Sequence, residues 1–382
     1  MSWIYCNCRG FKKMKIDAVE IYHVAMPMIH PFKTAFGNTH TIESVLVKLI
    51  SGDHYGWGEA ASWQYPAFSP EFAEGQFLVS KQFITPSLLG RDISSGRQLQ
   101  DGLAWIKGNF FAKAGFDLAW WDLYAKMQNK PLWQILGGKS PDVESGADFG
   151  ILEKVDILID TITKAVADGY KRVKLKYGPG WELDMISAVR ETFPDLIIHV
   201  DCNSAYTLAD IEMLKQLDKY NLAMIEQPLM SDDLVDHAFL QAKLKTPICL
   251  DESITSQAKM RKAVQLKACQ WVNIKLGRTG GITNALEINK ICEVAGIPCW
   301  VGSMGDSGIG ASHNIAFSTL SNIKYPCDIF PTKRLYEKDL AIPEIVHSAP
   351  SMFSAKDVPG IGVEPDPEML SKETQHQAVV KR

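Results

Sequence analysis

The middle of this 382-residue chain repeats a unit of about 25 residues, and an ionisable side chain ends most of its short apolar segments. These segments cover residues 172–176, 196–201, 223–226, 248–251, 271–275 and 297–301. The first five end, at intervals of 25, 25, 25 and 24 residues, in Lys176, Asp201, Glu226, Asp251 and Lys275. One strand, two loops and a helix of about three turns need on the order of 25 residues, so the period is structural. The pattern predicts an α/β fold of repeated strand–helix units around a parallel sheet.

The charged strand ends are expected to meet in space. A closed parallel barrel brings the carboxyl ends of its strands to one mouth, where the active sites of such barrels lie. The alternative is that polar residues end these strands by coincidence. One charged strand end would be unremarkable, but five in phase are hard to attribute to chance.

Three of the converging side chains are carboxylates from consecutive strands, Asp201, Glu226 and Asp251. A set of hard oxygen donors without His or Cys suits Mg²⁺, with Mn²⁺ as a second candidate, better than Zn²⁺. Without an ion, three converging carboxylates would repel one another. The competing interpretation is structural and pairs these carboxylates with the lysines on either side.

Lys176 and Lys275 stand on the strands before and after the carboxylates. A lysine beside a divalent cation and a second ammonium has its charged form disfavoured, which suits it to act as a base. Lys174 points to the same side of its strand as Lys176 and supplies that second ammonium. A bound carboxylate substrate with a base beside its α-carbon indicates proton abstraction to an enediolate.

Charge and apolar patterning narrow the classes of partner. With 44 acidic and 40 basic side chains the net charge is −4, and no dense Lys/Arg run suggests nucleic-acid binding. The sequence contains no apolar run of about 18 residues, so no membrane-spanning helix is predicted. The opening residues lack the order of a secretory signal, and most of the eight cysteines are scattered singly, so we expect a cytoplasmic protein with free thiols. A metal site at Cys6 and Cys8 would rest on one weak C-x-C motif.

Several motifs together resemble the enolase superfamily, in its muconate-lactonising-enzyme-like subgroup. In the repeated region they are Lys174–Lys176, Asp201–Asn203, Ile225–Pro228, Leu250–Ser253 and Asn273–Gly281. Upstream, Gly56–Glu59 and Ala119–Asp122 resemble parts of the capping domain and of the helix that leads into the barrel. The resemblance implies a modified (β/α)8 barrel of the TIM type with an N-terminal α+β capping domain.

The domain boundaries expected on this basis divide the chain into four parts. They are an extension at 1–13, a capping domain at 14–135, a barrel at 136–335 and a segment at 336–382 that returns to the capping domain. A capping segment around Phe32–His40, with Gly37 as its hinge, is expected to close over a small-molecule carboxylate substrate. A plain surface loop is the alternative there, and a homo-oligomer is left open.

The K-x-K motif and the sixth-strand lysine resemble those of o-succinylbenzoate synthases and N-succinylamino acid racemases. The resemblance implies a Mg²⁺-dependent syn dehydration in menaquinone synthesis, with Asp201, Glu226 and Asp251 as metal ligands. Lys176 would remove the α-proton and return it to the departing hydroxyl, while Lys275 stabilises the enediolate. The residues given supporting roles, with purely structural roles as the alternative, are Lys174, Asn203, Glu252 and Arg278.

The substrate pocket is expected near Gly302, Ser303 and Met304, which resemble a pocket segment of this group. Asp306 replaces the usual Glu, and Asp148 stands on the first strand where relatives often have Ser, so the substrate side chain stays undecided. N-succinylamino acid racemase is the main alternative, with dipeptide epimerase and muconate cycloisomerase behind it. A metal-free lyase that forms a Schiff base and a non-catalytic metabolite-binding protein are further alternatives.

Overall fold

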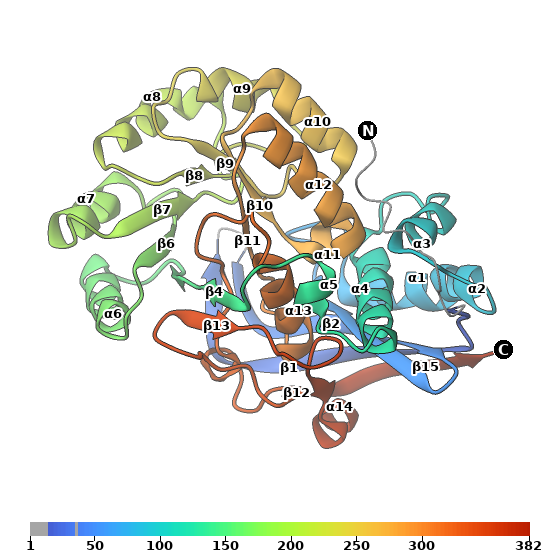
Figure 1. Ribbon diagram of the computed structural model, residues 1–382. Coiled ribbons are helices and arrows are strands. Elements are labelled where there is room, and N and C mark those ends of the chain that lie inside the picture. The colour runs from blue at the N-terminus through green and yellow to red at the C-terminus, as the bar shows by residue number, and fades with distance from the viewer. Residues whose placement is uncertain (1–13, 35–36) are drawn as a thin grey trace.

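The computed structural model describes residues 14–34 and 37–382. Figure 1 shows a curled parallel sheet with helices along its outer side, next to an antiparallel sheet that packs against a group of helices. The extension expected at 1–13, with Cys6 and Cys8, lies outside the described residues. The six described cysteines are free and buried. No helix in the described ranges is long and apolar enough to cross a membrane.

The curled sheet has seven parallel strands in the described chain, and neighbours in the sheet follow one another in sequence. The strands are β5 (Ala147–Phe149), β6 (Arg172–Lys176), β7 (Ile197–Asp201), β8 (Ile225–Glu226), β9 (Ile248–Leu250), β10 (Trp271–Ile274) and β11 (Cys299–Val301). The helices that follow them are α6 (Val155–Ala167), α7 (Leu183–Thr192), η2 (Leu208–Asp210), α8 (Ile211–Leu214), η3 (Lys215–Lys219), α9 (Val235–Gln241), α10 (Gln257–Leu266) and α12 (Ile282–Ala295). This confirms the fold class expected from the period.

An eighth position in the barrel is filled by a segment that forms isolated bridges instead of a regular strand. Ile323 bridges to Cys299 in parallel, and Cys327 bridges to Ser145 just before β5. Residues 323–327 therefore connect the two edges of the seven-stranded sheet. The buried guanidinium of Arg172 reinforces this closure, because it donates to the carbonyl of Cys327 at 2.9 Å and to Asp328 Oδ1 at 2.7 Å.

The capping sheet has the strand order β15-β1-β2-β3, and all its pairs are antiparallel. Its strands are β1 (Ala18–Thr34), β2 (Gly37–Ser51), β3 (His54–Ala60) and, from the other end of the chain, β15 (Thr374–Lys381). The segment expected as a capping loop at 32–40 falls on the end of the β1–β2 hairpin, of which residues 35–36 are outside the described chain. Helical segments over 70–107 are α1 (Ala73–Val79), η1 (Ser80–Ile84), α2 (Thr85–Leu88) and α3 (Gly96–Gly102).

Helix α4 (Phe110–Met127) joins the two parts of the molecule. It lies so close to β3 that a Cβ at Gly56 would be 2.2 Å from the backbone nitrogen of Leu123, which explains why glycine stands there. On α4, the rings of Trp120 and Tyr124 stack with centroids 5.1 Å apart. Trp121 Nε1 donates to Thr283 Oγ1 on α12 at 2.9 Å. The aromatic cluster therefore serves packing.

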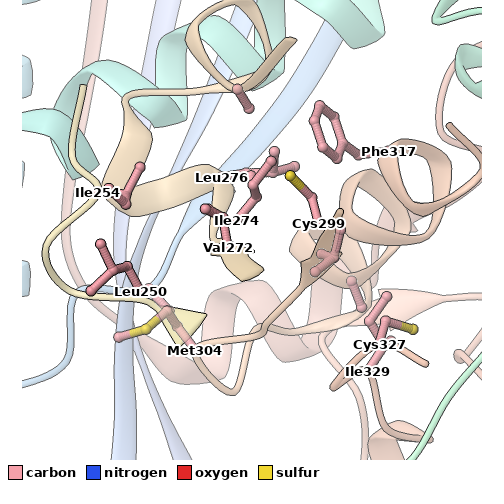
Figure 2. Close-up of a cluster of buried hydrophobic side chains, with 14 of the residues drawn as sticks. Leu250, Ile254, Val272, Ile274, Leu276, Cys299, Met304, Phe317, Cys327 and Ile329 are labelled. Atoms are coloured by element: carbon pink, nitrogen blue, oxygen red, sulfur yellow. The ribbon is translucent and has the colours of Figure 1, made fainter. Parts of the chain in front are cut away.

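The apolar core extends from the barrel into the helices around it. Figure 2 shows part of it, with Leu250 of β9, Ile274 of β10 and Phe317 of α13 (Gly308–Ser318) among the labelled side chains. A second buried cluster fills the space between the capping sheet and α4. The other elements are α5 (Leu132–Ile135), β4 (Asp142–Glu144), α11 (Leu276–Thr279), η4 (Thr332–Arg334), β12 (Ala341–Ile342), β13 (Met352–Ser354), β14 (Glu364–Pro365) and α14 (Pro367–Glu373).

Candidate active site

A cavity of about 280 Å³ lies at the carboxyl ends of the barrel strands, beneath the capping domain. Barrel residues that line it include Asp148, Lys174, Lys176, Asn203, Lys275 and Asp328. The capping domain contributes Met28, Thr39, Ile42, Trp63 and Phe68. The structure therefore brings the lysines selected from the 25-residue period into one cavity. Its upper wall comes from a part of the chain that the period does not reach.

The three acidic strand ends lie just below this cavity, in consecutive positions of the sheet. Asp201 pairs with Lys176 on one side and with Glu226 on the other in the parallel register. Asp251 directly follows β9, and Lys275 directly follows β10. Asp201, Glu226 and Asp251 are at most 1% exposed, so the lysines separate them from the cavity.

Each of these carboxylates contacts a cationic side chain. Lys174 Nζ lies 2.9 Å from Asp201 Oδ2 and 2.8 Å from Glu226 Oε2, and Lys176 Nζ lies 2.7 Å from the same Asp201 oxygen. Lys275 Nζ is 3.0 Å from Asp251 Oδ2, while Arg278 binds the other oxygen of Asp251. The ion pairs that the sequence leaves open as the structural alternative are therefore formed between these side chains. Within the described ranges, no three His, Cys, Asp or Glu side chains form a ready metal site.

The ion pairs set the protonation of the buried groups. Burial alone would raise the pKa of Asp201, but the ammonium groups of Lys174 and Lys176 hold it well below its ordinary value. Burial and Asp201 act to raise the pKa of Glu226, and Lys174 reverses this, so its pKa is also lowered. Burial would lower the pKa of Lys174, whereas Asp201, Glu226 and Asp328 raise it well above normal. These carboxylates are therefore ionised and Lys174 is charged.

The carboxylates retain oxygens suited to a divalent cation. Glu226 Oε2 and Asp251 Oδ2 are buried and accept no hydrogen bond of good geometry, although an ammonium lies near each of them. The donor set consists only of carboxylate oxygens, the ligands preferred by Mg²⁺ and Mn²⁺. The ammonium groups supply the positive charge that such a cation would otherwise provide. The residues present therefore fit a divalent cation, which would compete with the lysines for the same oxygens.

The supporting residues connect the lysines to the carboxylates. The Oδ1 atom of Asn203 accepts from Lys176 at 2.9 Å, and its Nδ2 donates to Glu252 Oε1 at 3.0 Å. Burial, together with the charge of Asp201, raises the pKa of Glu252 to about 7. Arg278 Nη2 donates to the carbonyl of Asn273 at 2.7 Å, while its Nη1 reaches Asp251. Arg278 therefore orients Asp251 from below the cavity.

The residues expected to form the substrate pocket separate into two groups. Asp148, Ser303 and Met304 line the main cavity, but Gly302 and Asp306 border a smaller space beside it. Asp306 accepts from Ser303 Oγ at 2.9 Å and from Asn314 Nδ2 at 3.0 Å, so in this structure it orders the turn after β11. A Cβ at Gly302 would lie 2.6 Å from Asn273 Oδ1, so glycine permits the close approach of that strand end.

Sequence reasoning did not select several residues that border or support the cavity. Asp328 bridges Lys174 and Arg172, and Asn273 Nδ2 donates to Glu226 Oε1 at 2.7 Å. A signal for Asp328 existed, because it stands 27 residues after the end of β11 at Val301 and so continues the period. No comparable signal marked Trp63 or Phe68, which approach the site only through the packing of the capping domain.

Comparisons with known proteins agree with this architecture across both domains. Residues 16–137 match the family model described as the mandelate racemase / muconate lactonizing enzyme N-terminal domain. Residues 158–369 match the model described as enolase C-terminal domain-like. The two matches leave residues 138–157 uncovered, which include β5, but together they span most of the capping domain and of the barrel.

Individual relatives match nearly the whole chain. It is 42% identical to the o-succinylbenzoate synthase of Geobacillus kaustophilus over 97% of this chain and 98% of that protein. It is 38% identical to the N-succinylamino acid racemase of Thermus thermophilus over 92% and 95% of the two chains. A solved structure of an enolase superfamily member from Listeria innocua superposes with a TM-score of 0.93 at 34% identity, covering 96% of this chain and 99% of the other.

Proposed function

The chain belongs to the enolase superfamily, with a mandelate racemase / muconate lactonizing enzyme N-terminal domain, and from this premise we propose that it is an o-succinylbenzoate synthase. The proposed reaction is the syn dehydration of a hydroxylated cyclohexadiene carboxylate in menaquinone synthesis. The observation that carries the proposal is that Lys176 and Lys275 line one cavity directly above three buried carboxylates. Full-length identity to synthases from several organisms supports the choice of reaction.

Asp201, Glu226 and Asp251 would hold a divalent cation, for which Mg²⁺ is the proposed identity. When bound, such an ion supplies positive charge that orients the substrate carboxylate and stabilises the negative charge that develops on it. The same positive charge favours the neutral form of the nearby lysines, as a base requires. Asn203 keeps Lys176 in place through its 2.9 Å hydrogen bond.

Lys176 acts first in the proposed mechanism. Its neutral amine takes the α-proton, and the electron pair of the broken C–H bond enters the enediolate. The resulting ammonium then donates that proton to the hydroxyl group as the C–O bond breaks, so that water leaves. Because one group removes and returns the proton, both events occur on the same face of the ring, which gives syn stereochemistry.

Lys275 contributes charge in the proposed mechanism without changing its protonation. Its Nζ lies 4.5 Å from the centre of the Phe68 ring, and it is held by Asp251 at 3.0 Å. An ammonium in a site from which water is excluded stabilises a developing enediolate by roughly a few kcal/mol. Phe68 and Trp63 supply the apolar cover that excludes water.

The experiment that tests the proposal is an assay of the purified protein with Mg²⁺ and the cyclohexadiene carboxylate. We expect formation of o-succinylbenzoate, followed by its aromatic absorbance, and its complete loss after chelation with EDTA. Addition of Mg²⁺ should then restore the formation of o-succinylbenzoate. An active protein that keeps turning over after exhaustive chelation contradicts the metal assignment, and a metal-loaded protein that yields no product contradicts the synthase assignment.

N-succinylamino acid racemase is the second candidate, because relatives with that name are 38% and 36% identical to the chain. The same two lysines would then each exchange the α-proton of one enantiomer. Efficient racemisation of N-succinylamino acids, with negligible dehydration, would place this function first. For either activity, the cysteines in the described part of the chain, which are free and buried, agree with the reducing cytoplasm as the proposed location.

A further inference from the structure

One arginine in the cavity wall has no role in the chemistry described above. Arg334 belongs to η4, which follows the segment that closes the barrel, and it borders the same cavity as Lys176 and Lys275. Its guanidinium lies over the ring of Phe330, 4.5 Å from the centroid, and 5.8 Å from the centroid of Phe149. It also donates to the backbone carbonyl of Asp148. Arg334 is therefore positioned by stacking and by a backbone hydrogen bond.

The charge of Arg334 has no acidic partner in the described chain. No carboxylate of residues 14–34 or 37–382 lies within 4.0 Å of its guanidinium, although it interacts with the hydroxyl of Tyr170. Lys174 and Lys275, which line the same cavity, each contact at least one carboxylate. A guanidinium presents five N–H donors in a planar fork that matches the two oxygens of a carboxylate. Arg334 can therefore bind an anionic group of a ligand.

The cavity between these charged groups has apolar walls. Side chains of Met28, Ile42, Trp63, Phe68, Met304 and Leu335 line it. The lining thus combines lysines above the carboxylates, apolar side chains and a separate cation, Arg334. A complementary ligand has a carboxylate at the reacting end, an apolar body and a second anionic group. The Asp148 carboxylate also lines the cavity, and burial raises its pKa although the charges of Lys176 and Lys174 act to lower it.

We infer that Arg334 binds the distal carboxylate of the substrate, and so selects succinyl compounds over otherwise similar monocarboxylates. The inference rests on the proposed function, because o-succinylbenzoate and the N-succinylamino acids both carry such a carboxylate at the end of a succinyl chain. Arg334 is in this view a specificity residue. It contacts the end of the substrate that does not react.

Equilibrium binding tests this assignment without relying on turnover. The ligands are o-succinylbenzoate and 2-butanoylbenzoate, in which a methyl group replaces the distal carboxylate. They are titrated by calorimetry into the Mg²⁺-loaded protein and into Arg334→Gln, Arg334→Lys and Lys333→Gln variants. Lys333 is the matched control, since it is the adjacent η4 cation, is 69% exposed and pairs with Glu344.

We expect Arg334→Gln to weaken o-succinylbenzoate binding about 10- to 100-fold, the loss of a charge-assisted hydrogen bond, while 2-butanoylbenzoate binds as before. Arg334→Lys should restore part of the preference, and Lys333→Gln should match the unmodified protein. Equal weakening of both ligands, or an unmodified protein with no preference for o-succinylbenzoate, overturns the inference. The proposed function fails separately, when the metal-loaded protein prefers the succinyl ligand but does not catalyse the dehydration.

Discussion

Two groups of carboxylates inside this protein are kept in opposite electrostatic states. Below the cavity, Asp201, Glu226 and Asp251 are surrounded by ammonium and guanidinium groups. At the contact between β3 and α13, the buried Glu59 and the partly buried Asp306 have no ion-pair partner in the described chain and are held instead by hydroxyl, backbone N–H and, for Asp306, side-chain amide donors.

The pKa values of the two groups differ accordingly. Those of Asp201 and Glu226 are lowered, since nearby ammonium groups outweigh the effect of burial. Burial, with the added charge of Asp306, raises the pKa of Glu59 to about 7, although Ser307, Ser44 and Gly310 donate to it. Burial alone therefore does not decide the state of a carboxylate here. The first set is paired with lysine side chains, and we propose that these give way to a metal ion, whereas the second set attaches the capping domain to the barrel through Ser307 and Gly310.

The largest expected effect is on turnover and metal binding. Glu226→Gln should lower turnover by at least about 10³-fold, because it removes the charge of one of the three buried carboxylates proposed to hold the metal. Glu59→Gln, an equally buried substitution in the second group, is the control for metal affinity. Mg²⁺ titration by calorimetry should detect binding to Glu59→Gln but not to Glu226→Gln. Comparable Mg²⁺ affinity in both variants would remove the functional distinction between the two groups.

Lys176 and Lys275, which lie above the first group, should differ in whether a permanently charged side chain can replace them. Arginine stays protonated near neutral pH, so Lys176→Arg should reduce dehydration by about 10²- to 10⁴-fold through loss of the base. Lys275→Arg should keep measurable dehydration, since that position needs only a positive charge. The measurement is kcat/KM with Mg²⁺ at saturation, on variants shown to be folded. Similar losses at both positions would contradict the assignment of a single base.

Removal of a buried ion-pair partner should cost more stability than removal of an exposed one. Asp328→Asn leaves the buried Arg172 and Lys174 with less compensating charge, and we expect a loss of roughly 3 kcal/mol in the free energy of unfolding. The control is Glu293→Gln, whose carboxylate pairs with Lys290 at the surface and should contribute at most about 1 kcal/mol. Urea unfolding measures both, and equal losses would contradict the expectation.

The smallest expected effect is the dependence of stability on pH. Because the pKa of Glu59 is raised from 4.5 to about 7 in the folded protein, the folded state binds the proton more tightly than the unfolded chain. Its contribution to stability is therefore complete below about pH 4.5 and is lost as the pH rises through 7. Relative to Glu59→Gln, the unmodified protein should lose on the order of 2 kcal/mol between pH 5 and pH 8. A difference between the two proteins that stays constant over this range would show that Glu59 does not titrate there.

Much of the barrel was predictable because its period is a local property of the chain. Strand β6 occupies residues 172–176 as expected, and β7 differs from the expected strand by one residue. A strand was expected over residues 223–226, but β8 is shorter and pairs only at Ile225 and Glu226. A strand that is paired on both sides within the barrel can be short. The apolar pattern therefore overestimates the length of such strands.

The upper half of the cavity was less predictable, since it depends on contacts between distant segments. Gly302 was expected in the pocket because Gly302–Met304 resembles a pocket segment of the synthase and racemase group, and Asp306 because it replaces the usual Glu that follows. In the structure, however, the turn after β11 directs Ser303 and Met304 toward the main cavity and Asp306 toward Asn314 on α13. Neighbours in sequence can face different spaces wherever the chain turns.

The sequence by itself determined that five charged side chains end successive strands of one parallel sheet, because spacing and apolar pattern specify strand ends without knowledge of any long-range contact. It left open whether the carboxylates are paired with lysines, and only the tertiary structure shows Lys174 between Asp201 and Glu226. Tertiary structure alone also places Arg334 and Phe68 in the same cavity. The physical reason is that strand ends follow from local periodicity, while side-chain pairing and cavity walls depend on how the capping domain and the closing segment pack against the barrel.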